Sequence, residues 1–299
     1  PIQDFIRFAN SSPVGERLRG FTDALDGSGP MKLALALRVP LRRSDDTTLK
    51  GRLSFVGDTL VPSGLPRVEQ VRGDIDFTGD SLSAKAITAQ FLGGPLRIAT
   101  TTRQSGVQIL AQGRATAAGM APWLGAAWAK RLSGQAVWRG QVDLESAGER
   151  IRIESDLVGL GSSLPAPLAK AGAQPLPLRV TSQPQPDGKL HDVQLGRTVS
   201  AVWRSTAAGD FARGEIRFGG PAVMPHEPGL RLAGSGRGFD ISGWMGLLPG
   251  GKGGGAEPSA EAGFARPDGG LGLGRVTATS VSPTTRPAVR PAARGGGRA

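Results

Sequence analysis

The chain has 299 residues, of which 38% are hydrophobic and 5% are aromatic, and it contains 46 Gly, 23 Pro and no Cys. This length and apolar content suffice for a sizeable core, and the many Gly and Pro residues predict frequent turns. The lack of Cys excludes disulfide bonds, thiolate metal sites and cysteine nucleophiles. No apolar stretch approaches the roughly 18 residues that a membrane-spanning helix needs.

The net charge is strongly positive, because 36 Lys and Arg residues stand against 25 Asp and Glu residues and give a formal charge of +11. A basic surface favours anionic partners such as phospholipid headgroups, nucleic acid or acidic glycans. The excess can equally reflect a compositional bias, since most of the basic residues are Arg. The sequence begins with Pro1 rather than Met, and we interpret it as an internal or trimmed piece of a longer protein.

Residues 1–29 are predicted to form a helical lead-in followed by a turn. Apolar residues recur there at roughly helical spacing, and Pro13 breaks or restarts the helix. From Met31 the apolar residues alternate with polar ones, as in Lys32-Leu33-Ala34-Leu35. This period is typical of a half-buried strand.

One pattern, apolar-x-Gly-x-apolar-x-apolar, then recurs along the chain, and its intervening positions are mostly charged or polar. One face of each strand is therefore apolar and the other is wet. Gly on the apolar face indicates curvature, a bulge or a close approach by another group. The copies lie at Leu49–Phe55, Val71–Phe77, Leu132–Trp138 and Ala212–Phe218.

Less regular strands follow the same alternation at Val107–Gly113, Ile151–Leu157, Leu178–Thr181, Val199–Trp203 and Leu230–Gly234. With the others they make about ten to fourteen strands. Turn signals between them predict antiparallel hairpins, and no alternation of strand and helix suggests a parallel sheet. We therefore expect an all-β dominated fold, in which a long curved antiparallel sheet forms an apolar groove with a few short amphipathic helices.

Two segments, Gly113–Leu132 and Gly236–Gly250, are predicted to be helical. Both open with Gly-Arg and both contain a Trp, which suggests an internal duplication of residues 30–132 and 133–249. In the first segment Leu124, Trp128 and Leu132 recur every four residues and predict an apolar stripe. Such helices can plug the ends of a curved sheet or dock on a membrane.

From Gly250 the composition changes to Gly, Pro and Arg, and residues 250–299 are predicted to be a disordered tail. Four Arg residues of this tail could contact anionic lipid or nucleic acid, but a solvated tail, or a tail foreign to the family, is the preferred interpretation. Residues 30–249 form the predicted β groove.

No set of residues with catalytic or metal-binding spacing is found, so we expect neither an enzyme nor a cofactor. His191 and His226 lack a third ligand nearby and are interpreted as surface or loop residues. The run Gly234–Gly238 lacks the full dinucleotide or P-loop pattern and is interpreted as a strand followed by a turn. Paired charges such as Asp74 with Asp76 fit the wet face of a sheet.

Several segments stand in a distinctive order and spacing: Phe8–Leu18, Gly27–Leu41, Leu49–Leu60, Val71–Leu82, Gly93–Ile98 and Gly113–Leu124. Over residues 1–249 they resemble the central and later region of AsmA-like envelope proteins of the YhdP type, and the tail after Gly250 departs from that pattern. The resemblance implies a periplasmic protein, anchored in the inner membrane by an N-terminal helix absent from this sequence, that carries phospholipid between the inner and outer membranes and supports the outer-membrane barrier. It implies no catalytic residue.

The residues support this expectation independently, because a sheet with one apolar face must cover that face or offer it to a ligand, and few helices are predicted to cover it. Phospholipid and the two membrane surfaces are the expected partners, and nucleic acid is not. The alternative functions are an assembly or scaffolding module without lipid cargo, and an enzyme or a binder of glycan or nucleic acid. For the lining residues the alternative is a closed sandwich across which they face each other. The predicted groove-lining residues are Leu33, Leu35, Leu37, Leu53, Phe55, Ile75, Phe77, Ile109, Trp138, Ile151, Ile153, Ile216 and Phe218.

Overall fold

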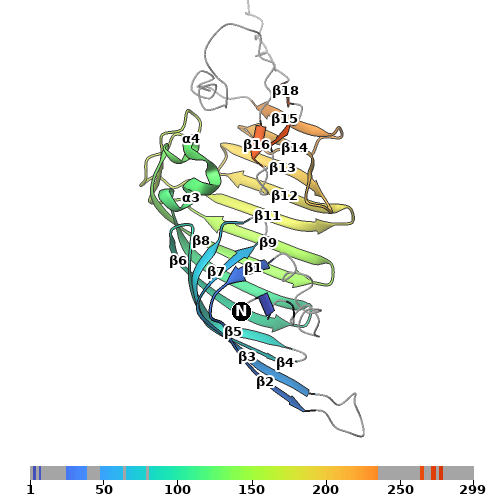
Figure 1. Ribbon diagram of the computed structural model, residues 1–299. Coiled ribbons are helices and arrows are strands. Elements are labelled where there is room, and N and C mark those ends of the chain that lie inside the picture. The colour runs from blue at the N-terminus through green and yellow to red at the C-terminus, as the bar shows by residue number, and fades with distance from the viewer. Residues whose placement is uncertain are drawn as a thin grey trace, which may run out of the picture.

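In a computed structural model the described residues form one large open β-sheet, a separate two-stranded sheet and two short helices, besides a few helical residues near the N-terminus (Figure 1), and this confirms the predicted fold class. The structure describes residues 3, 4, 7, 25–38, 48–62, 65–78, 81–234, 263–265, 271–273 and 276–278. Within these residues the main sheet has sixteen strands, more than the sequence predicted.

The strands of the N-terminal half are β1 Leu25–Ser28, β2 Lys32–Arg38, β3 Thr48–Pro62, β4 Val68–Thr78, β5 Leu82–Phe91, β6 Gly94–Arg103, β7 Gly106–Thr116, β8 Leu132–Glu145, β9 Gly148–Ser155 and β10 Leu160–Ser162. They are followed by β11 Leu178–Gln185, β12 Gly188–Leu195, β13 Val199–Thr206, β14 Phe211–Phe218, β15 Gly229–Gly234, β16 Gly263–Ala265, β17 Leu271–Leu273 and β18 Val276–Ala278. The helices are α3 Ala117–Leu124 and α4 Ala126–Ala129.

From β3 to β14 successive strands lie side by side and pair antiparallel, except that β10 pairs with β8 and β9 pairs with β11. The long strand β3 pairs with β2 along its first half and with β1 along its second half. At the other edge β14 pairs with β15, and β15 with β18, in parallel. The prediction of a purely antiparallel sheet is wrong there. The connection from β14 to β15 is too long for a hairpin, and it returns the chain to the end from which β14 started.

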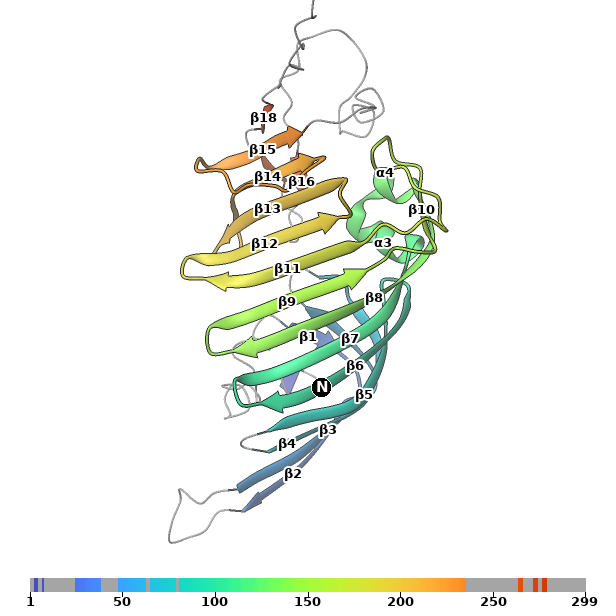
Figure 2. The same cartoon turned by 180° about the vertical axis from the view of Figure 1, so that it is seen from behind.

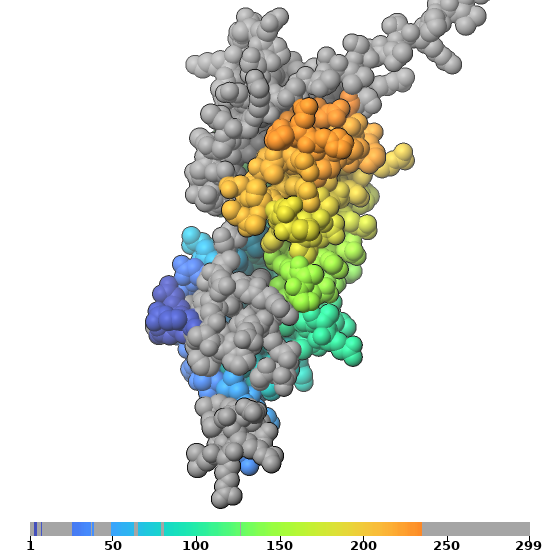
Figure 3. Space-filling model, turned by 90° about the vertical axis from the view of Figure 1, so that its right-hand side faces the viewer, coloured from blue at the N-terminus to red at the C-terminus, as the bar shows by residue number. Residues whose placement is uncertain are grey.

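The sheet curls toward its apolar face. The rings of Phe91 on β5 and Trp138 on β8 meet edge to face with centroids 5.7 Å apart, although β6 and β7 lie between their strands. In a flat sheet three strand spacings would separate them by about 14 Å. Figure 1 and Figure 2 show the N-terminal strands bending over this side, and Figure 3 shows the strand layers stacked along the long axis.

Glycine faces an aromatic residue directly across the strands at several points of the apolar face. Gly51 lies opposite Phe77 while Phe55 lies opposite Gly73, because the two copies of the repeated pattern pair antiparallel. A Cβ atom at Gly51 would collide with the Phe77 ring. The close approach that the sequence suggested is thus an aromatic ring of the neighbouring strand.

The same pairing recurs where Gly113 faces Trp138 and Gly214 faces Trp203. A Cβ at Gly113 would lie 2.9 Å from the indole. Gly134, the glycine of the third copy, is different, because it has a φ of 79° and its neighbour is the Gly159 carbonyl.

Two short helices replace the predicted helical segment at Gly113–Leu132. Gly113 still belongs to β7, and α3 begins after Thr116, whose hydroxyl accepts the Gly119 N–H at 2.9 Å. Gly125, with a φ of 82°, ends α3 and separates it from α4. The predicted stripe of Leu124, Trp128 and Leu132 is therefore wrong as one helical face, since Leu132 already begins β8.

Several predictions at the ends of the chain meet few described residues. Of the helical lead-in, Gln3, Asp4 and Arg7 are helical, and Leu25–Ser28 is strand β1 instead. The second predicted helix, Gly236–Gly250, lies outside the described residues, as does most of the predicted tail, within which β16, β17 and β18 are strands. The internal duplication stays a prediction.

Glu215 fixes the connection between β14 and β15 on the polar face. Its side chain is fully buried, and it accepts the Arg217 Nε–H at 2.7 Å and the Val223 N–H of the connection at 3.1 Å. Arg231 on β15 adds a second guanidinium 3.5 Å away. Burial alone would raise the pKa of Glu215, but these hydrogen bonds and positive charges lower it below its ordinary value.

The lowered pKa of Glu215 predicts an acid-sensitive edge. The stabilisation is fully present above the ordinary carboxyl pKa and is lost as the pH falls through the lower pKa of the folded state. We expect Glu215→Gln to cost about 1–3 kcal/mol at pH 7 and to flatten the fall of unfolding free energy in acid. Urea unfolding at several pH values measures this, with Glu154→Gln as an exposed ion-pair control. Equal acid slopes in wild type and Glu215→Gln would contradict it.

Gly51→Ala tests the pairing of glycine with aromatic residues. The added methyl group meets the Phe77 ring in a packed core, so we expect a loss of about 1–3 kcal/mol of unfolding free energy in denaturant melts. The control is Gly220→Ala, where the nearest atom to the new Cβ is an Arg217 side-chain carbon at 3.7 Å. Similar stabilities of the two variants would argue against the pairing.

Candidate functional site: the apolar face

An unbroken row of uncharged residues crosses ten consecutive strand neighbours of the sheet, and we call it the central row. Each member lies directly opposite the next in the strand register. The central row consists of Ile87, Ile98, Ala111, Gly140, Ile153, Val180, Val193, Ala201, Ile216 and Leu232. Nine strand spacings give it a length of about 43 Å across the strands.

The strand register places the predicted lining residues on the same face as the central row. Leu33 pairs with Leu53, and Leu53 pairs with Ile75. Ile109 pairs with Val142, which pairs with Ile151, beside the central row. The other members follow by alternation along their strands or by direct pairing: Leu35, Phe55, Phe77, Trp138, Ile153, Ile216 and Phe218. Leu37 pairs through its backbone with Leu49.

Burial divides the apolar face into two parts. Over β3 to β8 the side chains pack against each other, and Leu53, Phe77 and Leu144 are 2 to 3% exposed. Apolar residues do pack together here, but within the curl of one open sheet and not across a closed sandwich. On β9 and β11 to β15, in contrast, no apolar side chain is buried, and every member of the central row is half-buried there, as its members on β6 to β8 also are. We call this second part the open half of the apolar face.

The two sides of the central row differ in polarity over the open half. On one side lie Leu178, Leu195, Val199 and Phe218, which pair in succession. On the other side, next to the central row, lie Ser182, His191 and Trp203. Beyond them, Lys189 of β12 and Glu149 of β9 form an ion pair with Nζ and Oε2 2.7 Å apart. The cross-section is thus amphipathic.

His191 is held by its neighbours on this polar side. Its ring stacks on the Trp203 indole with centroids 4.8 Å apart, and its Nε2 lies 3.0 Å from the Ser205 hydroxyl. Burial, with a smaller contribution from the Lys189 charge, lowers the pKa of His191, so the ring is neutral at pH 7. His191 lies half-buried in strand β12 and not in a loop, whereas His226 is exposed in the connection between β14 and β15.

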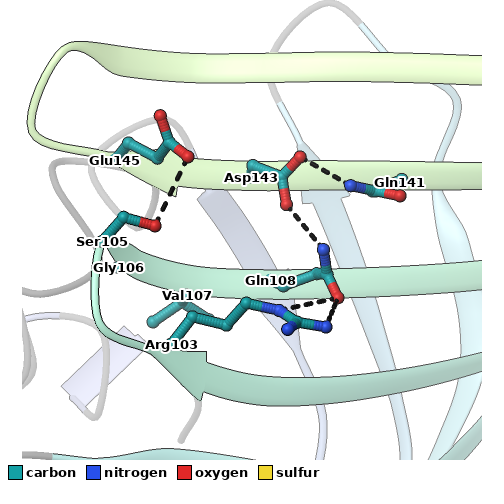
Figure 4. A pocket seen from close by; sticks show the side chains of 8 residues that line it. All are labelled: Arg103, Ser105, Gly106, Val107, Gln108, Gln141, Asp143 and Glu145. Atoms are coloured by element: carbon teal, nitrogen blue, oxygen red, sulfur yellow. Dashed lines mark hydrogen bonds between the residues drawn. The ribbon is translucent and has the colours of Figure 1, made fainter.

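The opposite face of the sheet is polar and carries its own hydrogen-bond network. A hollow of about 400 Å³ lies on this face. Its lining residues Arg103, Gln108, Asp143 and Gln141 are linked by hydrogen bonds in a chain across β6, β7 and β8 (Figure 4). The Gln108 amide donates to Asp143 at 3.0 Å and its oxygen accepts from Arg103 at 2.6 Å. These groups satisfy one another, as expected for the wet face of a sheet.

A second hollow of about 460 Å³ lies mainly on this polar face, between basic residues and the exposed Leu110. Arg97, Arg139 and Arg152 are among its lining residues, and Glu154 lies among them and pairs with Arg179 at 3.2 Å. Asp74 and Asp76 also lie on the polar face, as predicted, and Asp76 pairs with Arg52.

The described residues hold no group of three or more His, Asp or Glu side chains that could bind a metal ion. Lys170 is buried, and its ammonium donates to the backbone carbonyls of Leu157, Leu160 and Ala171. Burial lowers the pKa of Lys170, and its contacts fix the connection between β9 and β11. Neither α3 nor α4 nor any other helix in the described part of the chain is long and apolar enough to cross a membrane.

Sequence reasoning missed several residues of the open half. Val180, Val193 and Ala201 belong to the central row, and Lys189 and His191 to its polar side. β12 was not predicted as a strand, because Leu190 on the polar face and His191 on the apolar face obscure its alternation. Val193 and Leu195 carry the signal that could have found it, since they continue the period of two.

Residues 1–280 match the protein family described as YhdP protein. The chain is 25% identical over 200 residues to the "Intermembrane phospholipid transporter YhdP" of Escherichia coli (strain K12), a match that covers 63% of this chain and 15% of that relative. No solved structure matches the chain. The family match runs past Gly250 to residue 280, which corrects the expectation that the tail departs from the family pattern there.

Thiol labelling can test the division of the apolar face, because the chain contains no Cys and an introduced Cys is the single thiol. We expect Val193→Cys and Ile216→Cys to react readily with a maleimide. Leu144→Cys, at a position 2% exposed, should react at about one tenth of their rate or below. Labelling rates followed by mass spectrometry measure the difference. Equally slow rates at Val193 and Leu144 would show that the open half is closed, and equally fast rates would show that the packed part is open; either result contradicts the division.

Proposed function

Because the chain belongs to the YhdP protein family, we propose that its curved sheet is a segment of a conduit that carries phospholipid between two membranes. The acyl chains lie along the central row, and the headgroups stay toward the polar side of the open half. The E. coli relative named as an intermembrane phospholipid transporter supports this proposal. The chain spans 15% of that relative, so the complete conduit is longer than this segment.

The observation that carries the proposal is the continuity of the central row. No charged side chain interrupts it from Ile87 on β5 to Leu232 on β15. Its length of about 43 Å exceeds the roughly 15 Å that an acyl chain occupies in one leaflet. A lipid tail can therefore move by small steps while the row keeps its methylene groups in contact with apolar side chains.

Exposure of each methylene group to water costs about 0.8 kcal/mol. A complete acyl chain that crosses an aqueous gap without cover therefore faces a barrier of more than about 10 kcal/mol. Half-buried residues such as Val180, Val193 and Ile216 can cover such a chain and still remain open to its entry. A fully sealed core would bind the chain poorly, because its contacts are already used.

The setting that fits this activity is the periplasm, with the parent protein anchored in the inner membrane by an N-terminal helix and its far end at the outer membrane. Supply of phospholipid along this path supports the outer-membrane barrier. The edge strands β1 and β2 offer backbone groups to which further strands of a longer chain can add. The activity requires no catalytic residue.

A second candidate function, an envelope scaffold without lipid cargo, is favoured by the packed part of the apolar face. Leu53, Phe77, Leu82, Val107 and Leu144 form one buried cluster there, and this cluster leaves little space for a ligand. Such packing suits a rigid spacer. The two functions differ in whether the open half holds lipid.

Val193→Asp tests the conduit. The full chain, purified from cells, is expected to carry phospholipid that mass spectrometry detects, and a carboxylate in the central row should reduce bound lipid about tenfold or more, because a buried unpaired charge is costly. Leu190→Asp is the matched control, since Leu190 lies on the same strand but on the polar face of the sheet, where it pairs with Arg204.

Retention of lipid by Leu190→Asp with loss in Val193→Asp, both folded by circular dichroism, is the expected result. Lipid-free wild-type protein that takes up none from vesicles would favour the scaffold. Equal lipid content in both variants would place any bound lipid away from the central row.

A further inference from the structure

The polar side of the open half carries one pair of opposite charges, whereas the other described strand residues on this part of the face are uncharged. Glu149 and Lys189 come from β9 and β12, and they reach toward each other past Pro184 of β11. Both lie on the apolar face, because Ile151 and His191, two residues along their strands, pair with Val142 and Ser182. Their side chains are 26% and 43% exposed, so the pair is open to exchange with a ligand.

Neighbouring groups extend this pair into a polar strip. Ser205 lies opposite Lys189, and Trp203 lies opposite His191. The Ser205 hydroxyl and the His191 Nε2 are 3.0 Å apart and can both turn to an oxygen acceptor. Val180 and Val193 of the central row lie two residues further along the same strands, next to Ser182 and His191. Donors, a cation, an anion and an apolar floor therefore meet within one narrow part of the sheet.

We propose that this strip binds the headgroup of a zwitterionic, amine-bearing phospholipid: the phosphate binds the Lys189 ammonium with Ser205 and His191, and the headgroup ammonium binds the Glu149 carboxylate. This inference rests on the proposed function. In the exchange, the ion pair between Glu149 and Lys189 is replaced by two new ion pairs, so no charge is left without a partner. The tails then lie over the central row.

Charge complementarity distinguishes this occupant from an anionic phospholipid. A phosphodiester with an uncharged head alcohol would pair with Lys189 but would leave the Glu149 carboxylate without its cation and close to the phosphate. The strip therefore favours phosphatidylethanolamine over phosphatidylglycerol, although the whole chain is basic and its general charge would favour the anionic lipid. The site and the net charge thus predict opposite preferences.

The preference can be measured by incubation of the full chain with vesicles of equal parts phosphatidylethanolamine and phosphatidylglycerol with identical acyl chains. The ratio of bound lipids is read by mass spectrometry. We expect enrichment of phosphatidylethanolamine in the wild type and a fall of about two- to fivefold in that enrichment for Glu149→Gln. Lys189→Met should weaken binding of both lipids, and Glu149→Asp should retain the preference.

Matched controls come from the polar face of neighbouring strands. Glu154→Gln on β9 and Arg179→Met on β11 remove an ion pair of 3.2 Å there and should leave the lipid ratio unchanged. An unchanged ratio in Glu149→Gln, or no enrichment in the wild type, overturns the headgroup site while the conduit stands. Failure of the chain to bind either lipid overturns the conduit and this inference together.

Discussion

The structure depends on the way the apolar face makes room for its own aromatic rings. In an antiparallel pair, two copies of a pattern with an aromatic residue four positions after Gly place each Gly opposite the other copy's ring, as Gly51 with Phe77 and Phe55 with Gly73. A ring over a glycine fills space without pushing the strands apart, so the sheet can bend toward that face. Trp138 over Gly113 reaches as far as Phe91, and this contact closes the bend across two intervening strands.

The sheet is bent more strongly over β3 to β8 than from β9 onward, and the two regions have different physical roles. Where the sheet is most bent, Leu53 and Leu144 are buried and the face has become a core. From β11 to β14 short turns join the strands as hairpins, and no apolar side chain of β9 or β11 to β15 is buried. A packed core supplies rigidity through interlocked side chains, whereas a half-buried row retains free contacts for a ligand. The tightly bent strands can thus hold the shape that keeps the open half in place.

Much of this arrangement could be predicted from the sequence, because period-two alternation fixes which residues share a face. The predicted lining residues pair with one another or with the central row for this reason. Alternation does not determine which strands come together through the curl. The sequence alone therefore cannot tell that Leu144 is buried while Ile216 is only half-buried. His191 was not assigned to a strand because one polar residue on the apolar face resembles an irregularity until its partners, Ser182 and Trp203, are known. The parallel pairing of β14 with β15 was missed for a similar reason, since it depends on Glu215 and on contacts of a long connection.

A surface along which a molecule moves must bind at many positions and strongly at none, as conduction through a pore also requires. The central row meets this condition with small and branched residues of similar character, such as Val180, Val193 and Ala201, which offer nearly uniform contact. The polar strip meets it in another way, because the ion pair between Glu149 and Lys189 is partly exposed and therefore exchanges at little cost. Glu215 shows the opposite arrangement on the other face, where a fully buried carboxylate with two guanidinium groups fixes the chain permanently. The strength of each charged contact thus follows from its burial, which for Glu215 comes from the connection between β14 and β15 and for Glu149 and Lys189 stays partial on the open half.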